Sequence, residues 1–245
     1  MDLTEIWRYP RFFTSCMTLT EEDLHHAKRV LRVKAGDKIV LCDDGKDYLC
    51  EFSGENCQLS IVNCQLTPAE ARVHVRLFQC LPKFDKFDTI VRQAVELGAS
   101  EIIPVLSARC VSRPAGKAID GKIARWNKIA HEAAKQSGRG KIPPVRDVLL
   151  FENAARVCKP DELHILFYEC ADENSLRLSE LFANALTMPC AVNIFIGSEG
   201  GFEPHEAALA RESGWAVATL GVRILRVDTA AAAALTLVMN ATGNL

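Results

Sequence analysis

Three glycines and one glutamate stand together in Gly197-Ser198-Glu199-Gly200-Gly201, directly after the apolar segment 191–196. In open α/β sheets, ligands bind in the loops that follow the carboxyl ends of strands. Glycines there let backbone N–H and C=O groups approach a ligand closely. No G-K-[ST] sequence follows, and the turn lies near the C-terminal end, so it is neither a phosphate loop nor the dinucleotide fingerprint. The segment predicts a ligand-binding turn, and the alternative is a plain connecting loop.

A second turn of this kind spans residues 220–229, Leu-Gly-Val-Arg-Ile-Leu-Arg-Val-Asp-Thr. Asp228 or Thr229 is expected to cap the helix that follows. Arg223 and Arg226 precede that helix, although the helix dipole disfavours cations at its N-terminus. An anionic ligand or a nearby carboxylate would explain them. Glu199 is a candidate partner, because the two turns follow consecutive strands.

Positive charge is concentrated in the middle third of the chain. Residues 71–150 carry 15 Lys and Arg against 7 Asp and Glu, a net charge of +8, whereas the whole chain has a net charge of −2. The pattern indicates either a polyanionic partner or solvated helix faces. Trp126 lies within this stretch, and we expect it in the core rather than stacked on a base. The cations concerned are Arg109, Arg113, Lys117, Lys122, Arg125, Lys128, Lys135, Arg139 and Lys141.

Strands and helices alternate from residue 73 onward, which predicts a parallel sheet covered by helices. The strand candidates are residues 73–80, 101–106, 162–168, 191–196 and 216–220. The helix candidates are residues 87–97, 123–136, 175–186, 204–213 and 229–240.

The first seventy residues predict a different, mostly β structure. A capping-box sequence at Thr20 opens one helix to about Leu31. Short apolar runs follow at 38–42, 48–52 and 58–62, and Asp44-Gly45 between the first two predicts a tight hairpin. These strands suggest a small barrel over residues 1–70, a linker at 67–70 and a second domain over 71–245.

The composition is that of a globular protein, with 245 residues, 49% apolar and 24% charged. The longest apolar run, residues 230–239, is about half of the ~20 residues that a membrane span needs. We therefore expect a cytoplasmic protein. The ten cysteines show no C-x-x-C spacing, and we expect reduced, mostly buried thiols. The six histidines show no metal-type spacing, so no metal site is predicted.

Several motifs together resemble the RsmE family of 16S rRNA (uracil-N3)-methyltransferases, within the SPOUT superfamily. Residues 196–201 and 220–230 are similar to its I-G-P-E-G-G and L-G-x-R-I-L-R-x-E-T-A motifs. Residues 94–99 resemble its E-L-G-V helix end, and residues 132–143 its E-A-x-x-Q-S-x-R-x-x-x-P stretch. Pro10-Arg11-Phe12 and residues 26–37 resemble its N-terminal domain. Ser198 replaces the usual Pro, and Asp228 replaces the usual Glu.

The resemblance implies a C-terminal parallel α/β sheet with a deep trefoil knot and an N-terminal PUA-like RNA-binding barrel. It also implies S-adenosylmethionine as cofactor, a homodimer, and 16S ribosomal RNA within the assembled small subunit as partner. Two alternatives stay open: a SPOUT methyltransferase with another RNA target, and a non-catalytic RNA-binding or ribosome-assembly factor of the same fold.

Specific residues follow from the resemblance together with the residue chemistry. Arg226, Asp228 and Glu199 are the expected catalytic residues. The RNA-binding candidates are Arg11, Arg32, Arg109, Arg113 and Arg139. The cofactor-binding candidates are Gly197, Glu199, Gly200, Gly201, Leu220, Gly221, Ile224 and Leu225.

Overall fold

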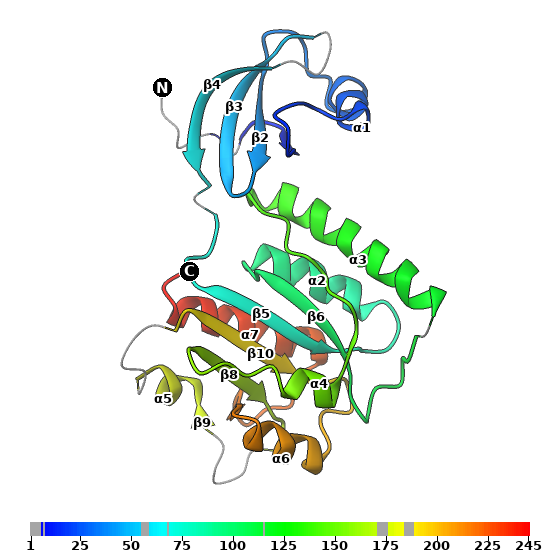
Figure 1. Cartoon of the computed structure of the whole chain (residues 1–245), viewed down its shortest axis with the longest axis vertical. Coiled ribbons are helices and arrows are strands. Elements are labelled where there is room, and N and C mark those ends of the chain that lie inside the picture. Colours follow the sequence, from blue (N-terminus) through cyan, green and yellow to red (C-terminus); the bar gives the residue numbers. More distant parts are fainter. Residues whose placement is uncertain are drawn as a thin grey trace. The chain divides into compact units, whose positions relative to one another are not determined.

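The computed structural model describes Ile6 and residues 8–54, 59–67, 69–114, 116–170, 176–183 and 189–245. The chain forms two compact units, which are coloured along the sequence in Figure 1. The first unit comprises Met1–Glu70 together with Ala134–Ile142, and the second comprises Ala71–Ala133 and Pro143–Leu245. The division after residue 70 was expected, but the return of residues 134–142 to the first unit was not.

The first unit is built on a four-stranded sheet in the order β1-β2-β3-β4, where the sequence suggested a barrel. Its strands are β1 (Arg11–Phe13), β2 (Lys38–Asp43), β3 (Lys46–Phe52) and β4 (Leu59–Leu66). β1 is parallel to β2, and the other neighbours are antiparallel. Asp44 and Gly45 form the β2–β3 turn with φ of 42° and 79°, which confirms the predicted hairpin.

One helical segment accompanies this sheet. It consists of α1 (Glu21–His25) and a π-helical turn, η2 (His26–Val30), and Thr20 caps it as predicted by accepting the Asp23 N–H. Its Ala27 joins a core with residues from three of the strands. The buried core residues are Phe12, Leu19, Ala27, Ile39, Leu41, Cys50 and Phe52.

The second unit contains a seven-stranded, entirely parallel sheet in the order β7-β6-β5-β10-β8-β11-β9. The five predicted strands are confirmed as β5 (His74–Cys80), β6 (Glu101–Leu106), β8 (Glu162–Phe167), β10 (Ala191–Ile196) and β11 (Ala216–Thr219). β7 (Leu149–Leu150) and β9 (Leu176–Arg177) were not predicted, because two-residue strands carry no periodic pattern. Every residue of β10 is buried, as expected for a central parallel strand.

Helices cover both faces of this sheet. α2 (Lys86–Glu96) and α7 (Val227–Ala241) pack on each other, and α7 also contacts β5 and β10. α4 (Phe151–Ala155) and α6 (Pro204–Glu212) form a second pair on the other face, the near side in Figure 1. α3 (Lys117–Gln136) begins earlier than predicted, and α5 (Leu178–Ala183) is the described part of the helix expected at 175–186.

Trp126 of α3 is buried, as predicted. Its ring centroid lies 4.3 Å from that of Phe87, and its indole N–H donates to Asp88 Oδ1 at 3.1 Å. The aromatic ring is therefore part of the α2–α3 packing and has no free face for a nucleobase.

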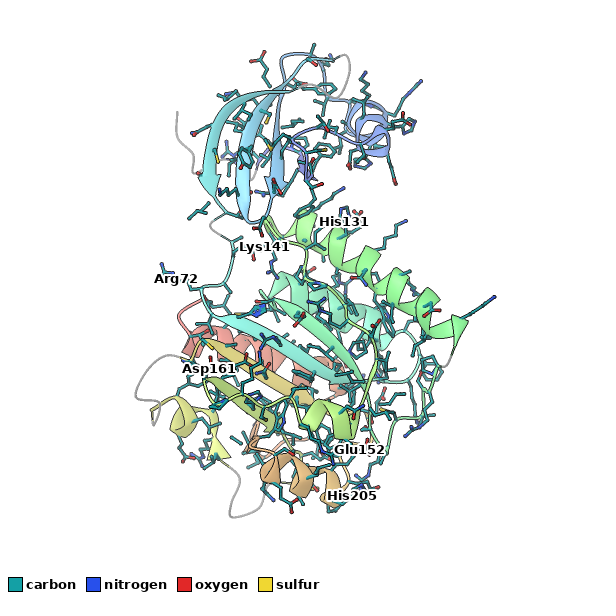
Figure 2. The ribbon with its side chains drawn as sticks, viewed as in Figure 1. Arg72, His131, Lys141, Glu152, Asp161 and His205 are labelled. Atoms are coloured by element: carbon teal, nitrogen blue, oxygen red, sulfur yellow. The ribbon has the colours of Figure 1, made fainter. Side chains whose placement is uncertain are left out.

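The nine described cysteines are all free thiols, but the expectation that most are buried is wrong. Cys42, Cys50, Cys80 and Cys110 are buried, whereas Cys16, Cys64, Cys170 and Cys190 are exposed. In the described part of the chain, no helix is long and apolar enough to cross a membrane. Nor do the described residues include a cluster of three or more metal-ligating side chains; His131 and His205, for example, lie on different helices (Figure 2).

Candidate cofactor and active site

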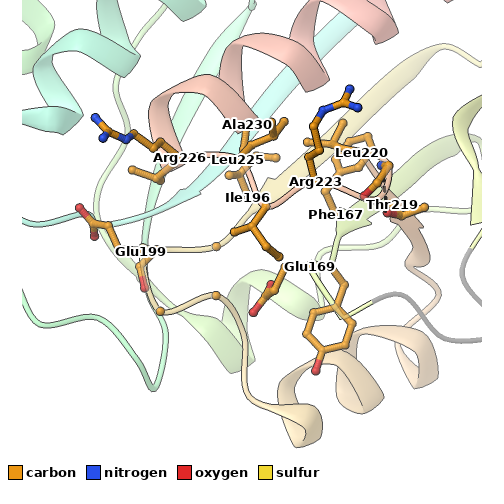
Figure 3. Close-up of a pocket in the computed structure, with 18 of the residues that line it drawn as sticks. Phe167, Glu169, Ile196, Glu199, Thr219, Leu220, Arg223, Leu225, Arg226 and Ala230 are labelled. Carbon is orange, nitrogen blue, oxygen red and sulfur yellow. Dashed lines mark hydrogen bonds between the residues drawn. The ribbon is translucent and has the colours of Figure 1, made fainter.

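Both predicted turns line a single cavity of about 460 Å³ at the carboxyl ends of β8, β10 and β11 (Figure 3). Parallel strands end at the same edge of a sheet, so loops that follow them converge there. The predicted site residues that line this cavity are Gly197, Glu199, Gly200, Gly201, Leu220, Gly221, Ile224, Leu225 and Arg226. Asp228 is not among the described residues of its lining.

The first turn is closed tightly at Gly201. Its N–H donates to the carbonyl oxygen of Ser198 at 3.0 Å, and its φ is +66°. A Cβ at this position would overlap the carboxylate of Glu169. A Cβ at Gly197 would lie 3.1 Å from the Cα of Gly201. The glycines therefore allow two strand-end loops to approach each other and to expose backbone groups to the cavity.

Glu199 is held by the loop that follows β5. Its carboxylate accepts the Lys83 backbone N–H at 3.1 and 3.2 Å and pairs with Lys86 Nζ at 3.0 Å. Burial opposes ionisation, but these hydrogen bonds outweigh it, and the pKa of Glu199 lies below its usual value. Glu199 was expected to pair with Arg223 or Arg226, but in the described structure the cation that it pairs with is Lys86.

The second turn leads directly into α7, whose N-cap residue is Arg226. The expectation that Asp228 or Thr229 caps the helix is therefore wrong, because the chain becomes helical two residues earlier. Asp228 lies in the first turn, where its negative charge stabilises the helix dipole. Figure 3 shows Arg223 and Arg226 extending from this loop in different directions, so the two guanidinium groups lie in different surroundings.

Arg109 braces the glycine turn, although it was predicted to bind RNA. Its Nη1 donates to the Gly200 carbonyl at 2.7 Å, and its Nε and Nη2 donate to Glu203 at 2.9 and 3.2 Å. The Ser198 hydroxyl donates to the Arg109 carbonyl at 3.4 Å. Because most of its donors have partners within the protein, the contacts of Arg109 favour a role in holding the turn.

The other RNA-binding candidates divide into buried and exposed residues. Arg11 and Arg139 have side chains only 6% and 3% exposed, in ion pairs with Asp47 at 2.6 Å and Glu70 at 2.8 Å. These two lie inside the first unit, and their contacts indicate a structural role. Arg113 donates to the Ser107 carbonyl at 2.6 Å. Arg32 is exposed and stays a candidate for phosphate.

Sequence reasoning missed several lining residues. Glu169 follows β8 at the same sheet edge, and the predicted strand 162–168 was the signal that could have located it. Lys86 belongs to α2 and was hidden by the core pattern of that helix. The missed lining residues outside the two predicted turns are Lys86, Phe167, Tyr168, Glu169 and Thr219.

Comparison with known proteins places this architecture in a characterised class. Residues 69–239 match the model of an RNA methyltransferase domain, and residues 19–62 match that of an RNA methyltransferase PUA domain. The chain is 32% identical over 218 residues to the ribosomal RNA small subunit methyltransferase E of Bacillus subtilis, covering 87% of this chain and 85% of the relative. The corresponding protein of Mycobacterium tuberculosis is 30% identical, with 86% and 80% covered.

A crystal structure of the ribosomal RNA small subunit methyltransferase E from Neisseria gonorrhoeae, bound to S-adenosyl methionine, has the same fold. Its TM-score is 0.80 at 27% identity, over 95% of this chain and 97% of that chain. The fold, with its PUA and parallel-sheet domains, is thus that of the RNA methyltransferases. Within them, the chain belongs to the ribosomal RNA small subunit methyltransferase E (RsmE) family, which confirms the resemblance found in the motifs.

Proposed function

We propose that this protein transfers a methyl group from S-adenosylmethionine to N3 of a uridine in the RNA of the small ribosomal subunit. One observation carries the proposal: the two turns that resemble the family's motifs line the same cavity. The relatives named for small-subunit RNA methylation, and the neighbour bound to the cofactor, support it independently.

The cavity suits this cofactor chemically. Phe167, Ile196 and Leu225 offer apolar surface for an adenine ring, and the glycines offer backbone groups. Glu169 and Glu199 give the lining negative charge that could hold a sulfonium or an ammonium group, and Arg223 could pair with a carboxylate. The bound cofactor supplies an electrophilic methyl group. The protein's own contribution is to hold both reactants in line and to stabilise charge.

Uracil N3 is a weak acid and becomes a good nucleophile only when its proton is lost. We assign to Arg226 the stabilisation of the resulting anion, as a fixed donor acts in an oxyanion hole. Glu199 already accepts the Lys83 N–H and pairs with Lys86, so we assign it an electrostatic role rather than proton transfer. Asp228 is the candidate proton acceptor, directly or through water, although its side chain is not among the described residues that line the cavity.

We further propose that two copies associate through the loop before α7 and the exposed face of that helix. Val222 is 98% exposed and Ile224 is 79% exposed, and Leu237 of α7 lies on the surface as well. Apolar side chains so fully exposed indicate an interaction surface. A two-fold dimer joins the same patch of both copies, so one apolar patch is enough to form it. The knotted threading that the resemblance implies is part of the same proposal.

The decisive experiment combines cofactor binding with product analysis. Calorimetry should show that the purified protein binds S-adenosylmethionine. Assembled small ribosomal subunits lacking the modification should then accept labelled methyl, and nucleoside analysis should find 3-methyluridine. Cofactor binding without methyl transfer to any RNA would instead favour a non-catalytic RNA-binding factor. Transfer to another RNA or to another atom would disprove the substrate assignment.

A further inference from the structure

Phe84 is a large aromatic residue that projects from the loop joining β5 to α2. Its side chain is 86% exposed, and its φ is +56°. A bulky residue rarely adopts the left-handed region, since its Cβ crowds the backbone there. Neither burial nor backbone preference therefore explains a phenylalanine at this position.

The loop around Phe84 is firmly anchored on both sides. Leu81 and Phe87 are each 2% exposed, so the chain enters and leaves the loop in the core. The backbone N–H of Lys83, the preceding residue, donates to Glu199, and the Lys86 ammonium pairs with the same carboxylate. These contacts fix the backbone on both sides of Phe84.

The same contacts tie Phe84 to the proposed active site. Glu199 and Lys86 both line the cavity. Lys83, which precedes Phe84 in the sequence, is exposed. An exposed ring next to cations is the combination that binds single-stranded RNA, because the ring stacks on a base and the cations meet the phosphates.

We propose that Phe84 is a stacking platform for a nucleobase of the RNA substrate, a role that rests on the proposed methyl transfer to uridine. The N3 atom lies on the Watson–Crick edge of uracil, so the target base must be unpaired or turned out of its stack. An aromatic ring beside the cavity replaces the stacking that the target or its neighbour loses. The left-handed backbone and the anchored loop hold that ring away from the core.

The test is a pair of variants with opposite chemistry. Phe84→Asn removes the ring but suits the left-handed backbone, because Asn adopts that region readily. We expect it to raise the KM for assembled small subunits about tenfold. The Kd for S-adenosylmethionine should not change, and the melting temperature should be equal or higher. Phe84→Trp should keep KM near wild type, and RNA should quench its fluorescence more than that of the wild type, which already contains three tryptophans.

Leu150→Ala is the matched control, because Leu150 is also an exposed apolar residue but belongs to β7, an edge strand that contributes no residue to the cavity lining. An unchanged KM in Phe84→Asn, or a fall in its melting temperature, would overturn the proposal. Loss of self-association by sedimentation would assign Phe84 to a protein interface instead. If the wild type transfers no methyl group, the proposed function fails, whereas indole quenching by small-subunit RNA still tests the stacking separately.

Discussion

Gly201 is under two constraints that differ in origin. Its φ of +66° disfavours any residue with a Cβ, and that Cβ would also overlap the carboxylate of Glu169. Gly243 offers a comparison, because its φ is +69° but a Cβ added there would meet no atom within 4 Å. Comparing substitutions at the two glycines therefore separates the free-energy cost of the left-handed backbone from the cost of steric overlap.

Gly201→Ala should therefore be more damaging than Gly243→Ala. Both variants incur about 1–2 kcal/mol for the left-handed backbone, but only Gly201→Ala displaces Glu169. We expect a larger fall in melting temperature and weaker S-adenosylmethionine binding by calorimetry. Adding Glu169→Ala to Gly201→Ala should restore part of the lost stability. Equal effects of the two single substitutions would show that the contact with Glu169 is unimportant.

Arg226 is the residue on which the chemistry of the proposed reaction depends most. Arg226→Ala should lower kcat by about 10²-fold, the usual cost of removing one donor to a developing anion. Arg226→Lys should recover part of that loss, because it keeps the positive charge. Single-turnover methylation of small subunits measures both. Near-normal turnover in a folded Arg226→Ala protein would contradict the anion-stabilising role.

Substitution of Arg109 should weaken cofactor binding rather than RNA binding. Because its guanidinium holds the Gly200 carbonyl and Glu203, Arg109→Ala should loosen the turn and raise the Kd for S-adenosylmethionine about tenfold, the cost of roughly one charge-assisted hydrogen bond. The salt dependence of RNA binding should stay unchanged. Arg156→Ala, at an exposed cation that ends α4, serves as the control. A reduced salt slope would instead restore Arg109 as a phosphate contact.

Residue types at strand ends were a better guide to the site than charge was. The glycine turn was found because it follows an apolar strand, and Arg226 was found because a helix dipole disfavours a cation at its N-terminus. Charge alone did not separate Arg11 and Arg139 from exposed cations, since a sequence does not show which cation has a buried carboxylate as its partner. Glu169 was missed for a related reason: its role depends on a close approach to Gly201 from a distant segment.

At the scale of elements, the amino end of β8 is joined to its neighbours through Glu162. Its carboxylate accepts hydrogen bonds from Arg76 of β5 and Asn193 of β10, each at 2.9 Å. Burial opposes ionisation, but these bonds, with the charge of Arg76, lower the pKa of Glu162 to about 2. The ionised carboxylate therefore connects three adjacent strands, β5, β10 and β8.

This arrangement predicts a pH-dependent contribution to stability. Because the folded pKa lies below the unfolded one, ionised Glu162 stabilises the protein above about pH 4.5. The contribution, roughly 1–3 kcal/mol after allowance for solvent screening, is lost as pH falls toward 2. Urea unfolding should give Glu162→Gln a lower free energy of unfolding than wild type at pH 7. The difference between the two free energies should shrink below pH 4. A constant difference would contradict this assignment.

Elements with a strong periodic pattern were predictable almost to the residue. β6 and β10 have the expected bounds because each is a short, mostly apolar segment between turn residues. α3 begins at Lys117 rather than near Ile123, since its first turns lack an apolar stripe. The start of α7 was misplaced because no side chain caps it, so the sequence carried no capping signal at Arg226.

At the scale of the whole molecule, the proposed self-association can be tested at Val222. Val222→Asp places a charge on the most exposed of the apolar residues proposed for the interface, and burying an unpaired charge is costly. We expect sedimentation to show a shift from dimer toward monomer, with reduced methyl transfer if each site needs both copies. Val111→Asp, at another exposed valine, is the control. A monomeric wild type would disprove the proposed dimer.

The return of residues 134–142 to the first unit affects how the chain can fold during its synthesis. Glu70 accepts hydrogen bonds from Arg139 and from the backbone N–H groups of Gly140 and Lys141, and Gly45 donates to the Gly140 carbonyl. None of these contacts exists while only the first seventy residues have been made. The N-terminal unit therefore completes its folding late, after part of the second unit has been translated. In a nascent chain halted before residue 142, the first unit lacks these contacts.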